Sequence, residues 1–156
     1  MARYQVILAY DGTQFHGSQR QKDTRTVQGV VEETLRKLNW TASSILLSGR
    51  TDAGVHATGQ VICFDLDWHH PAQKLSNALN ALLPDDVSAR HVSEVNPGFH
   101  PRYDAVSRSY RYQAFCDPLR HPLRERFAWR VWPTPKRELL QKAADLFLGI
   151  HDYAAF

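Results

Sequence analysis

The spacing of apolar residues changes repeatedly along the first 95 residues, and the order of these changes constrains the fold most. Residues 3–10 alternate between apolar and polar, which predicts a strand, and apolar residues recur every three or four positions over residues 27–38, which predicts a helix after a Thr26 cap. Further strands are expected near residues 45–47, 59–66 and 87–95, and a second helix over residues 71–82. The order β-α-β-β-α-β predicts an α+β protein with a ferredoxin-like (RRM-like) unit and a mixed or antiparallel sheet.

A second unit is expected after residue 98. Residues 96–103 carry two prolines and a glycine, a composition typical of a connection between units. Beyond this connection, strands are expected near residues 105–115 and 126–132, and a helix over residues 135–148 that stops at Gly149. We therefore expect two domains, residues 1–98 and residues 99–156, of which the second is the beginning of another unit of similar kind.

Composition restricts the class of protein. With 156 residues, 43% of them hydrophobic, and no long apolar run, the chain is typical of a soluble globular protein without a membrane segment. The first residues lead directly into the strand-like pattern and lack the charged and apolar regions of a signal peptide, so we expect a cytoplasmic protein. Cys63 and Cys116 are too few for a disulfide framework or a zinc site, which predicts free thiols.

The excess of basic residues lies in the last part of the chain. Lys and Arg number 9 against 10 Asp and Glu over residues 1–98, but 10 against 6 over residues 99–156. Aromatic residues are interleaved with these arginines, a mixture suited to phosphates and unstacked bases, so we expect RNA as the partner. The arginines are Arg102, Arg108, Arg111, Arg120, Arg124, Arg126 and Arg130. Any single one of them fits a solvated sheet face over aromatic core residues equally well.

The segment SGRTDAGVHATGQV, residues 48–61, has the composition of a functional loop between two strands. Arg50 is close enough in sequence to Asp52 to keep its carboxylate ionised and to fix its direction, and such a carboxylate can act as a nucleophile or as a base. Gly49 and Gly54 bracket the pair and allow a flat ligand to approach the backbone. From spacing alone, the alternative is an ordinary Asx-type turn at Asp52, with Arg50 as a solvated surface residue.

The string GRTDAGVHATGQV closely resembles the signature of the TruA family of tRNA pseudouridine synthases. Other segments occur in the order that this family shows. They are YDG at residues 10–12, VQ at 27–28, NALN at 77–80, FHPR at 99–102, RSYRY at 108–112 and GIHDY at 149–153. The resemblance covers essentially the whole chain, implies that Asp52 is the catalytic residue, and favours this role over the ordinary turn.

The resemblance implies conversion of uridine to pseudouridine in tRNA, at positions 38, 39 and 40 of the anticodon arm, without a cofactor. The target nucleotide must leave the base stack to reach a carboxylate. Arg50 is expected to position Asp52 and to help hold the flipped nucleotide, Tyr110 to support the uracil ring, and His56 to support the fold around the site. The residues expected to hold the RNA backbone are Arg20, Arg102, Arg108 and Arg111.

The chain departs from the family pattern in two places. The usual G-W-Q is here Gly17-Ser18-Gln19, which replaces a large indole by a hydroxyl. Members of the family also continue well beyond the G-x-H-D-[FY] segment, and their additional region completes the second domain, supplies further active-site residues and helps to form a homodimer. We therefore expect an incomplete second domain here, with low activity and with association through exposed strand edges and apolar surface.

Three alternatives follow from the same residues. A noncatalytic RNA-binding remnant would also use a ferredoxin-like sheet with exposed aromatic residues, although no run matches the RNP1 pattern. A member of the family with different uridine sites is the second alternative. Metal catalysis is the third, but neither Asp52 with His56 nor the pair His69-His70 has a third ligand at a recognisable spacing, so no metal site is expected.

Overall fold

The structure is a computed structural model that describes residues 1–153. The chain divides into two compact units, residues 1–108 and residues 109–156. Residues 99–108 pack with the first unit, although the proline-containing connection predicts a boundary after residue 98. Arg3 Nη1 donates to the Phe99 carbonyl at 3.0 Å, and Arg108 Nη2 donates to the Ser48 carbonyl at 2.9 Å. These two arginines fasten the segment to the sheet and to the loop beside it.

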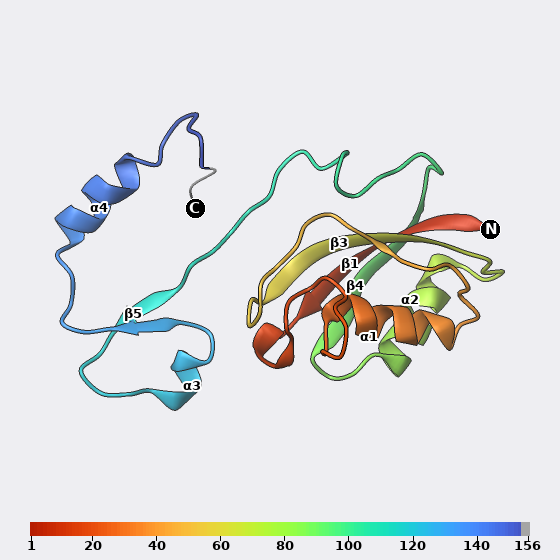
Figure 1. Cartoon of the computed structure of the whole chain (residues 1–156), viewed down its shortest axis with the longest axis horizontal. Helices are drawn as coiled ribbons and strands as arrows, with labels where there is room; N and C mark the ends of the chain where they lie inside the picture. The colour runs from red at the N-terminus through yellow and green to blue at the C-terminus, as the bar shows by residue number, and fades with distance from the viewer. Residues whose placement is uncertain (154–156) are drawn as a thin grey trace. The chain divides into compact units, whose positions relative to one another are not determined.

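The first unit is built on a four-stranded antiparallel sheet. Its strands are β1 (Ala2–Tyr10), β2 (Leu46–Leu47), β3 (Ala57–Leu66) and β4 (Val87–Val95), in the order β2-β3-β1-β4. Helices α1 (Val27–Arg36) and α2 (Ala72–Leu82) lie against one face of this sheet (Figure 1). The α+β class and the antiparallel sheet expected from the sequence are therefore present.

The core lies between the sheet and the two helices. It uses alternate strand residues and helix residues three or four positions apart. The buried set includes Tyr4, Val6, Leu8 and Tyr10 of β1, Val27, Val31 and Leu35 of α1, and Leu75 and Leu79 of α2. Burial of each aliphatic side chain of this size contributes about 1.5–3 kcal/mol. The apolar residues that alternate along the strands and those that recur every three or four positions in the helices thus form one core.

The ends of α1 follow local signals. Thr26 Oγ1 accepts from Gly29 N at 3.2 Å, which confirms the predicted N-cap. Beyond the other end, Asn39 has a φ of 63°, a left-handed conformation that asparagine tolerates, and Trp40 N donates back to the Leu35 carbonyl at 3.1 Å. The helix therefore ends before residue 38, the last position of the apolar pattern. Among residues 1–153, no helix has the length and apolar character needed to cross a membrane.

The second unit differs from its prediction. Its elements are β5 (Ala114–Cys116), α3 (Pro122–Glu125), β6 (Trp129–Val131) and α4 (Arg137–Asp145), and the two strands pair in parallel. The long strand predicted over residues 105–115 is wrong, because only its last two positions fall in β5. A strand needs a hydrogen-bonded neighbour, and within residues 1–153 the backbone of residues 105–113 meets another strand only at Gln113, whose carbonyl accepts from Trp129 N at 2.8 Å.

Large apolar side chains are exposed in the second unit. Among its described residues, only Phe115 is a buried hydrophobic side chain. The exposed ones include Tyr110, Tyr112, Leu119, Leu123, Trp129, Trp132, Leu139, Leu140, Leu146, Leu148 and Ile150. Apolar surface of this extent usually marks a place where protein surfaces meet. The unit therefore presents an apolar surface available for association.

An ion pair joins β1 to β3 on the sheet face opposite the helices. Arg3 Nε donates to Asp65 Oδ1 at 2.7 Å, and Arg3 Nη2 donates to Asp65 Oδ2 at 2.8 Å. The hydrogen bonds from Arg3 hold the pKa of the Asp65 carboxyl below its ordinary value. A carboxyl with a lowered pKa in the folded state stabilises the protein above its unfolded-state pKa, and this contribution is lost as the pH falls through the folded-state pKa.

We expect Asp65→Asn to lower the free energy of unfolding at neutral pH by up to about 1 kcal/mol, since the pair is partly solvated. The difference from the parent should shrink as the pH falls below about 3.9, the ordinary pKa of aspartate. Urea unfolding of both proteins across this pH range measures the effect. Asp67→Asn, which removes a more exposed carboxylate nearby, is the control. A stability difference that stays constant with pH would contradict the assignment.

Candidate active site

The loop between β2 and β3, residues 48–56, carries Asp52 on a tight turn. Val55 N donates to the Asp52 carbonyl at 3.2 Å, and Gly54 has a φ of 78°. A positive φ at the third residue of a four-residue turn is the conformation that favours glycine. The side chains of Arg50 and Asp52 are exposed. The turn therefore presents the Asp52 carboxylate to solvent from a defined backbone.

Thr51, the residue before Asp52, is held at three of its atoms. Ser18 N donates to the Thr51 carbonyl at 2.9 Å, and Thr51 N donates to Ser18 Oγ at 2.8 Å. The Tyr10 hydroxyl and Thr51 Oγ1 share a hydrogen bond of 2.8 Å. Tyr10 and Ser18 are both buried. The exposed aspartate thus follows directly on a residue that is fastened to buried groups.

Burial favours the protonated form of the Tyr10 hydroxyl. It raises the pKa of Tyr10, while the hydrogen bond with Thr51 acts in the opposite direction. Since the ordinary pKa of tyrosine is already about 10, the hydroxyl is protonated at neutral pH. The Tyr10 hydroxyl can therefore act as the donor to Thr51 Oγ1 at neutral pH.

Two glycines let the segment of residues 10–18 approach the loop closely. A Cβ atom at Gly12 would lie 2.0 Å from the Val55 carbonyl oxygen. Gly17 has a φ of 90°, and a Cβ there would lie 2.8 Å from the Thr51 carbonyl oxygen. Because neither distance admits a carbon atom, only glycine allows this packing without movement of the backbone.

His56 connects the end of the loop to the residues after β1. Gly12 N donates to His56 Nδ1 at 3.0 Å, and this nitrogen lies 3.1 Å from Asp11 Oδ1. Asp11 also accepts from Thr13 N at 3.0 Å, at the start of the short 3-10 helix η1 (Gly12–Gln14). His56 is half-buried. Its contacts lie within the backbone framework of the loop, which is compatible with the supporting role that the sequence suggests.

Arg50 does not hold Asp52 in the way that the spacing predicts. Among residues 1–153, no ion pair within 4.0 Å joins Arg50 to Asp52. Both side chains are exposed, and an exposed pair gains little over separate hydration. The backbone at Thr51, rather than the guanidinium, therefore fixes the place from which the carboxylate projects.

The arginines expected to hold RNA differ in their surroundings. Arg108 reaches the start of the loop, since its Nη2 donates to the carbonyls of Ser48 at 2.9 Å and of Arg102 at 3.2 Å. The Arg102 side chain is exposed. Arg20 Nη1 donates to the buried Glu32 at 2.5 Å, so its guanidinium also neutralises an internal carboxylate. Arg108 is thus the one of these three that contacts the loop.

Tyr110 and Arg111 belong to the second unit. Both side chains are exposed, in a segment without strand structure. The sequence predicts a strand over residues 105–115, but β5 begins only at Ala114 and does not include these two residues. The role of Tyr110 beside the uracil ring therefore stays a prediction.

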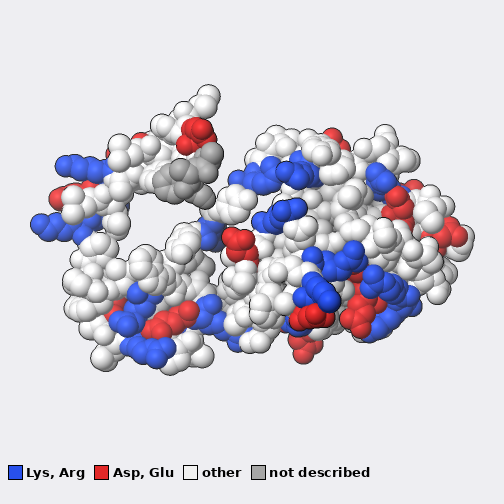
Figure 2. All heavy atoms as spheres, in the orientation of Figure 1, with Lys and Arg blue, Asp and Glu red and all other residues white. Residues whose placement is uncertain are grey.

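Charged groups of both signs lie side by side on the surface (Figure 2). In the second unit, Glu125 accepts from Arg120 at 3.2 Å and from Arg130 at 3.0 Å. The Arg124 guanidinium lies over the Phe115 ring, 4.1 Å from its centroid. Arg120, Arg124 and Arg130 therefore have partners within the protein.

Sequence reasoning missed the buried groups that support the loop. Tyr10 and Ser18 lie more than thirty residues from Thr51 in the chain, and their contacts with it depend on the fold. Gln60 was also missed, and its Nε2 donates to the Gly49 carbonyl at 2.7 Å. The available signal was the pair of glycines at positions 12 and 17, which often mark a close approach of backbone segments.

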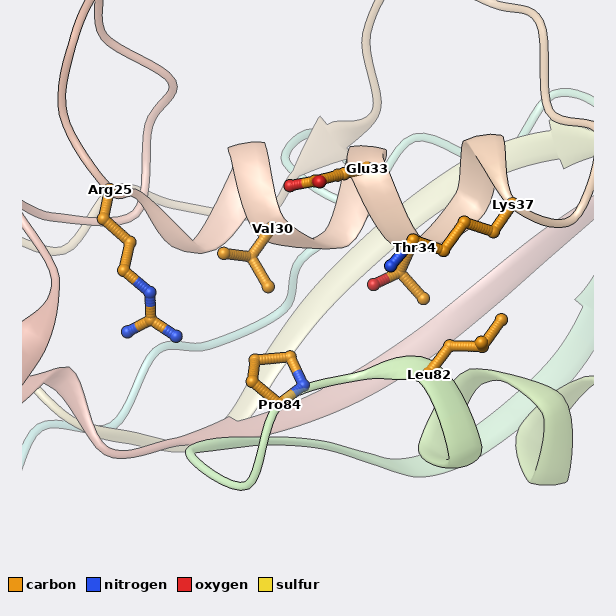
Figure 3. A pocket seen from close by; sticks show the side chains of 7 residues that line it. All are labelled: Arg25, Val30, Glu33, Thr34, Lys37, Leu82 and Pro84. Atoms are coloured by element: carbon orange, nitrogen blue, oxygen red, sulfur yellow. The ribbon is translucent and has the colours of Figure 1, made fainter.

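A groove of about 280 Å³ lies apart from this loop. Its lining comes from α1, from the residues on either side of α1 and from the residues around the end of α2, and consists of Arg25, Val30, Glu33, Thr34, Lys37, Leu82 and Pro84 (Figure 3). None of these residues belongs to the loop. Arg25 is also engaged with Asp86, through contacts of 2.7 and 2.9 Å. The groove therefore contributes nothing to the candidate site.

No group of three His, Cys, Asp or Glu side chains gathers as a set of metal ligands within residues 1–153. His69 Nε2 lies 3.5 Å from Asp67 Oδ2, and His70 meets Trp68 edge-on. His56, the histidine of the loop, is engaged with Asp11 and Gly12. The histidines singled out in the sequence thus have other neighbours.

An exposed carboxylate on a braced loop at the end of an antiparallel sheet defines a candidate acid–base or nucleophilic site. A sequence profile of the tRNA pseudouridine synthase family matches residues 6–104. The chain is 42% identical over 156 residues to tRNA pseudouridine synthase A of Geobacter sp. (strain M21), and 41% identical over 158 residues to tRNA pseudouridine synthase A of Pseudothermotoga lettingae. The chain therefore belongs to the tRNA pseudouridine synthase family.

These matches cover all of this chain but only part of each relative. The chain spans 63% of the Geobacter protein and 64% of the Pseudothermotoga protein. The tRNA pseudouridine synthase A of Brevibacillus brevis, 42% identical over 156 residues, is likewise matched over 64% of its length. The chain thus corresponds to just under two thirds of the length of these curated relatives.

We expect Gly12→Ala to lower the free energy of unfolding by about 1–3 kcal/mol, because the added carbon forces the Val55 backbone to move. Gly59→Ala is the matched control, since a Cβ atom at Gly59 meets nothing within 4 Å. Urea unfolding of the two variants and the parent measures the difference. Equal stabilities of the two variants would contradict the close packing of the loop.

Proposed function

We propose that this chain is the part of a tRNA pseudouridine synthase that carries the catalytic aspartate, and that Asp52 acts in the conversion of uridine to pseudouridine in tRNA. The observation that carries this proposal is the contrast between Thr51, bonded at three atoms, and the exposed Asp52 that follows it. A catalytic group needs a rigid support and an accessible functional atom. The names of the matched relatives support the choice of reaction.

The chemistry suits a protein site without a cofactor. Uridine and pseudouridine contain the same atoms. The bond from C1′ of the ribose to N1 breaks, a bond from C1′ to C5 forms, a proton leaves C5, and N1 gains one. A carboxylate can act in this sequence as a nucleophile or as a base. The substrate is neither oxidised nor reduced overall, so no redox partner is consumed.

The exposed position of Asp52 suits a nucleotide that has left its stack. Flipping a base out of a stem costs a few kcal/mol, and contacts with the displaced nucleotide must offset this cost. Arg50 projects from the same turn, and its guanidinium is available for a phosphate. Arg108 is fastened to the Ser48 carbonyl and brings a second positive charge to the loop. We assign both arginines to RNA, with Tyr110 beside the uracil ring.

The remaining parts of the proposal concern the complete protein. We assign uridines 38, 39 and 40 of the anticodon arm as its targets, the cytoplasm as its location and a homodimer as its assembly. We further propose that residues 1–98 form a ferredoxin-like domain and that residues 99–156 begin a second domain. The strand order β2-β3-β1-β4, with both helices on one face, supports the first of these assignments.

Asp52→Asn should abolish pseudouridine formation and leave tRNA binding within about twofold of the parent, because an amide keeps the shape of the side chain but neither attacks carbon nor removes a proton at neutral pH. Product is measured on an unmodified tRNA with uridines in the anticodon arm, and binding by filter retention. Asp67→Asn, at the far end of β3, is the matched control.

Two results would contradict the proposal. Product from the Asp52→Asn protein would remove Asp52 from the chemistry. Binding of tRNA without product from the parent, at enzyme in excess over tRNA, would favour the noncatalytic RNA-binding alternative. Product at uridines outside the anticodon arm would leave the reaction intact and correct only the assigned positions.

The apolar surface of the second unit leads to a prediction about association. We expect the chain to elute from a sizing column as species larger than a monomer, in amounts that rise with concentration, because apolar side chains are exposed along residues 109–153. The double substitution Leu139→Gln and Leu140→Gln in α4 should reduce this association. Val106→Gln, at an exposed residue of the first unit, is the control, and a monodisperse parent monomer would refute the prediction.

A further inference from the structure

We infer that Ser18 is a positioning residue, whose side-chain hydroxyl holds the Thr51 backbone and thereby sets the place from which Asp52 acts. This inference rests on the proposed role of Asp52. Ser18 Oγ accepts from Thr51 N at 2.8 Å, while Ser18 N donates to the Thr51 carbonyl at 2.9 Å. Ser18 is 0% exposed. The amide and the carbonyl of the residue before Asp52 are thus both bonded to one buried residue.

Ser18 is itself held by helix α1. Gln28 N, in the first turn of this helix, donates to the Ser18 carbonyl at 2.9 Å. The Gln28 side chain accepts from Arg20 N at 2.9 Å and donates to the buried Glu32 at 2.8 Å. Residues 18–20 are therefore fixed to a helix that packs into the core. A rigid path of hydrogen bonds leads from α1 through Ser18 to Thr51.

The hydroxyl is the part of Ser18 that this bond requires. The Thr51 amide needs an acceptor, and a serine oxygen supplies one. A tryptophan side chain, which occupies this place in the G-W-Q pattern, has a donor but no acceptor on its ring. The contact between side chain and amide therefore depends on the serine that this chain carries at position 18.

The position of Asp52 depends strongly on this backbone contact. Asp52 is exposed, and in the described part of the chain no ion pair to Arg50 restrains it. A misplacement of about 1 Å lowers the rate of a reaction by about 100-fold. We expect the loss of one of the hydrogen bonds at Thr51 to move the loop by less than this and to lower the rate by about tenfold.

The test compares Ser18→Ala with the parent in the full chain. We expect amide exchange at Thr51, measured by NMR, to become at least about tenfold faster. In single-turnover assays with the protein in excess over tRNA, the maximal rate of pseudouridine formation should fall by about tenfold, with the half-saturating protein concentration unchanged. Ser18→Thr keeps the hydroxyl and should recover both readouts.

Asn80→Ala is the control. Asn80 Oδ1, in α2, also accepts from a backbone amide, that of Ala89, at 2.9 Å, and its Nδ2 donates to the Ala89 carbonyl at 2.9 Å. Its loss removes bonds between α2 and β4 and none to α1 or to the loop. This variant should lower Tm without changing either amide exchange at Thr51 or the maximal rate.

Unchanged exchange at Thr51 in the Ser18→Ala protein would overturn the inference. A loss of rate no larger than that of Asn80→Ala at equal loss of Tm would also overturn it, since Ser18 would then act only on stability. Failure of the proposed function has different signatures, because it appears as product from the Asp52→Asn protein or as tRNA binding without product from the parent. The exchange measurement does not depend on turnover. It therefore tests the contact between Ser18 and Thr51 whether or not the proposed function is correct.

Discussion

Three hydrogen bonds between Thr51 and residues of the segment 10–18 connect the loop of residues 48–56 to the core. One partner, Tyr10, is the buried last residue of β1, one of the two central strands of the sheet. The other, Ser18, is bound to α1 through Gln28. Each bond contributes only about 0.5–1.5 kcal/mol to stability. Their joint effect is to fix one residue, Thr51, through its amide, its carbonyl and its side chain, and the candidate site depends on this residue.

The arrangement separates support from accessibility within two neighbouring residues. Thr51 takes up the hydrogen bonds, so the side chain of Asp52 needs no partner inside the protein to be placed. A carboxylate bonded to internal donors would be less basic and less accessible. The glycines at positions 12 and 17 complete this arrangement, because they let the supporting segment lie against the loop.

The sequence predicts the first unit well and the second unit poorly. The strands and helices of residues 1–98 can be predicted because the spacing of apolar residues within each element indicates its type. Thr26 marks the start of α1 as expected. The strand predicted over residues 105–115 fails because strand structure also needs a neighbour, which the local pattern does not reveal. The motif proposes Asp52 from neighbouring residues alone, whereas the contact between Ser18 and Thr51 links residues far apart in the chain. Spacing also misplaces Arg50, since two neighbouring charges at a surface pair weakly.

The buried carboxylate of Glu32 limits how this part of the chain can change during evolution. It accepts from the side chains of Gln28 and Arg20 and from the backbone of Ile45, and so joins the segments before and after α1. An apolar residue at position 32 would leave the Ile45 amide without this acceptor, and the loss of Arg20 would leave Arg36, 3.7 Å away, as the remaining cation beside a buried charge. Positions 20, 28 and 32 are therefore expected to vary together among related sequences.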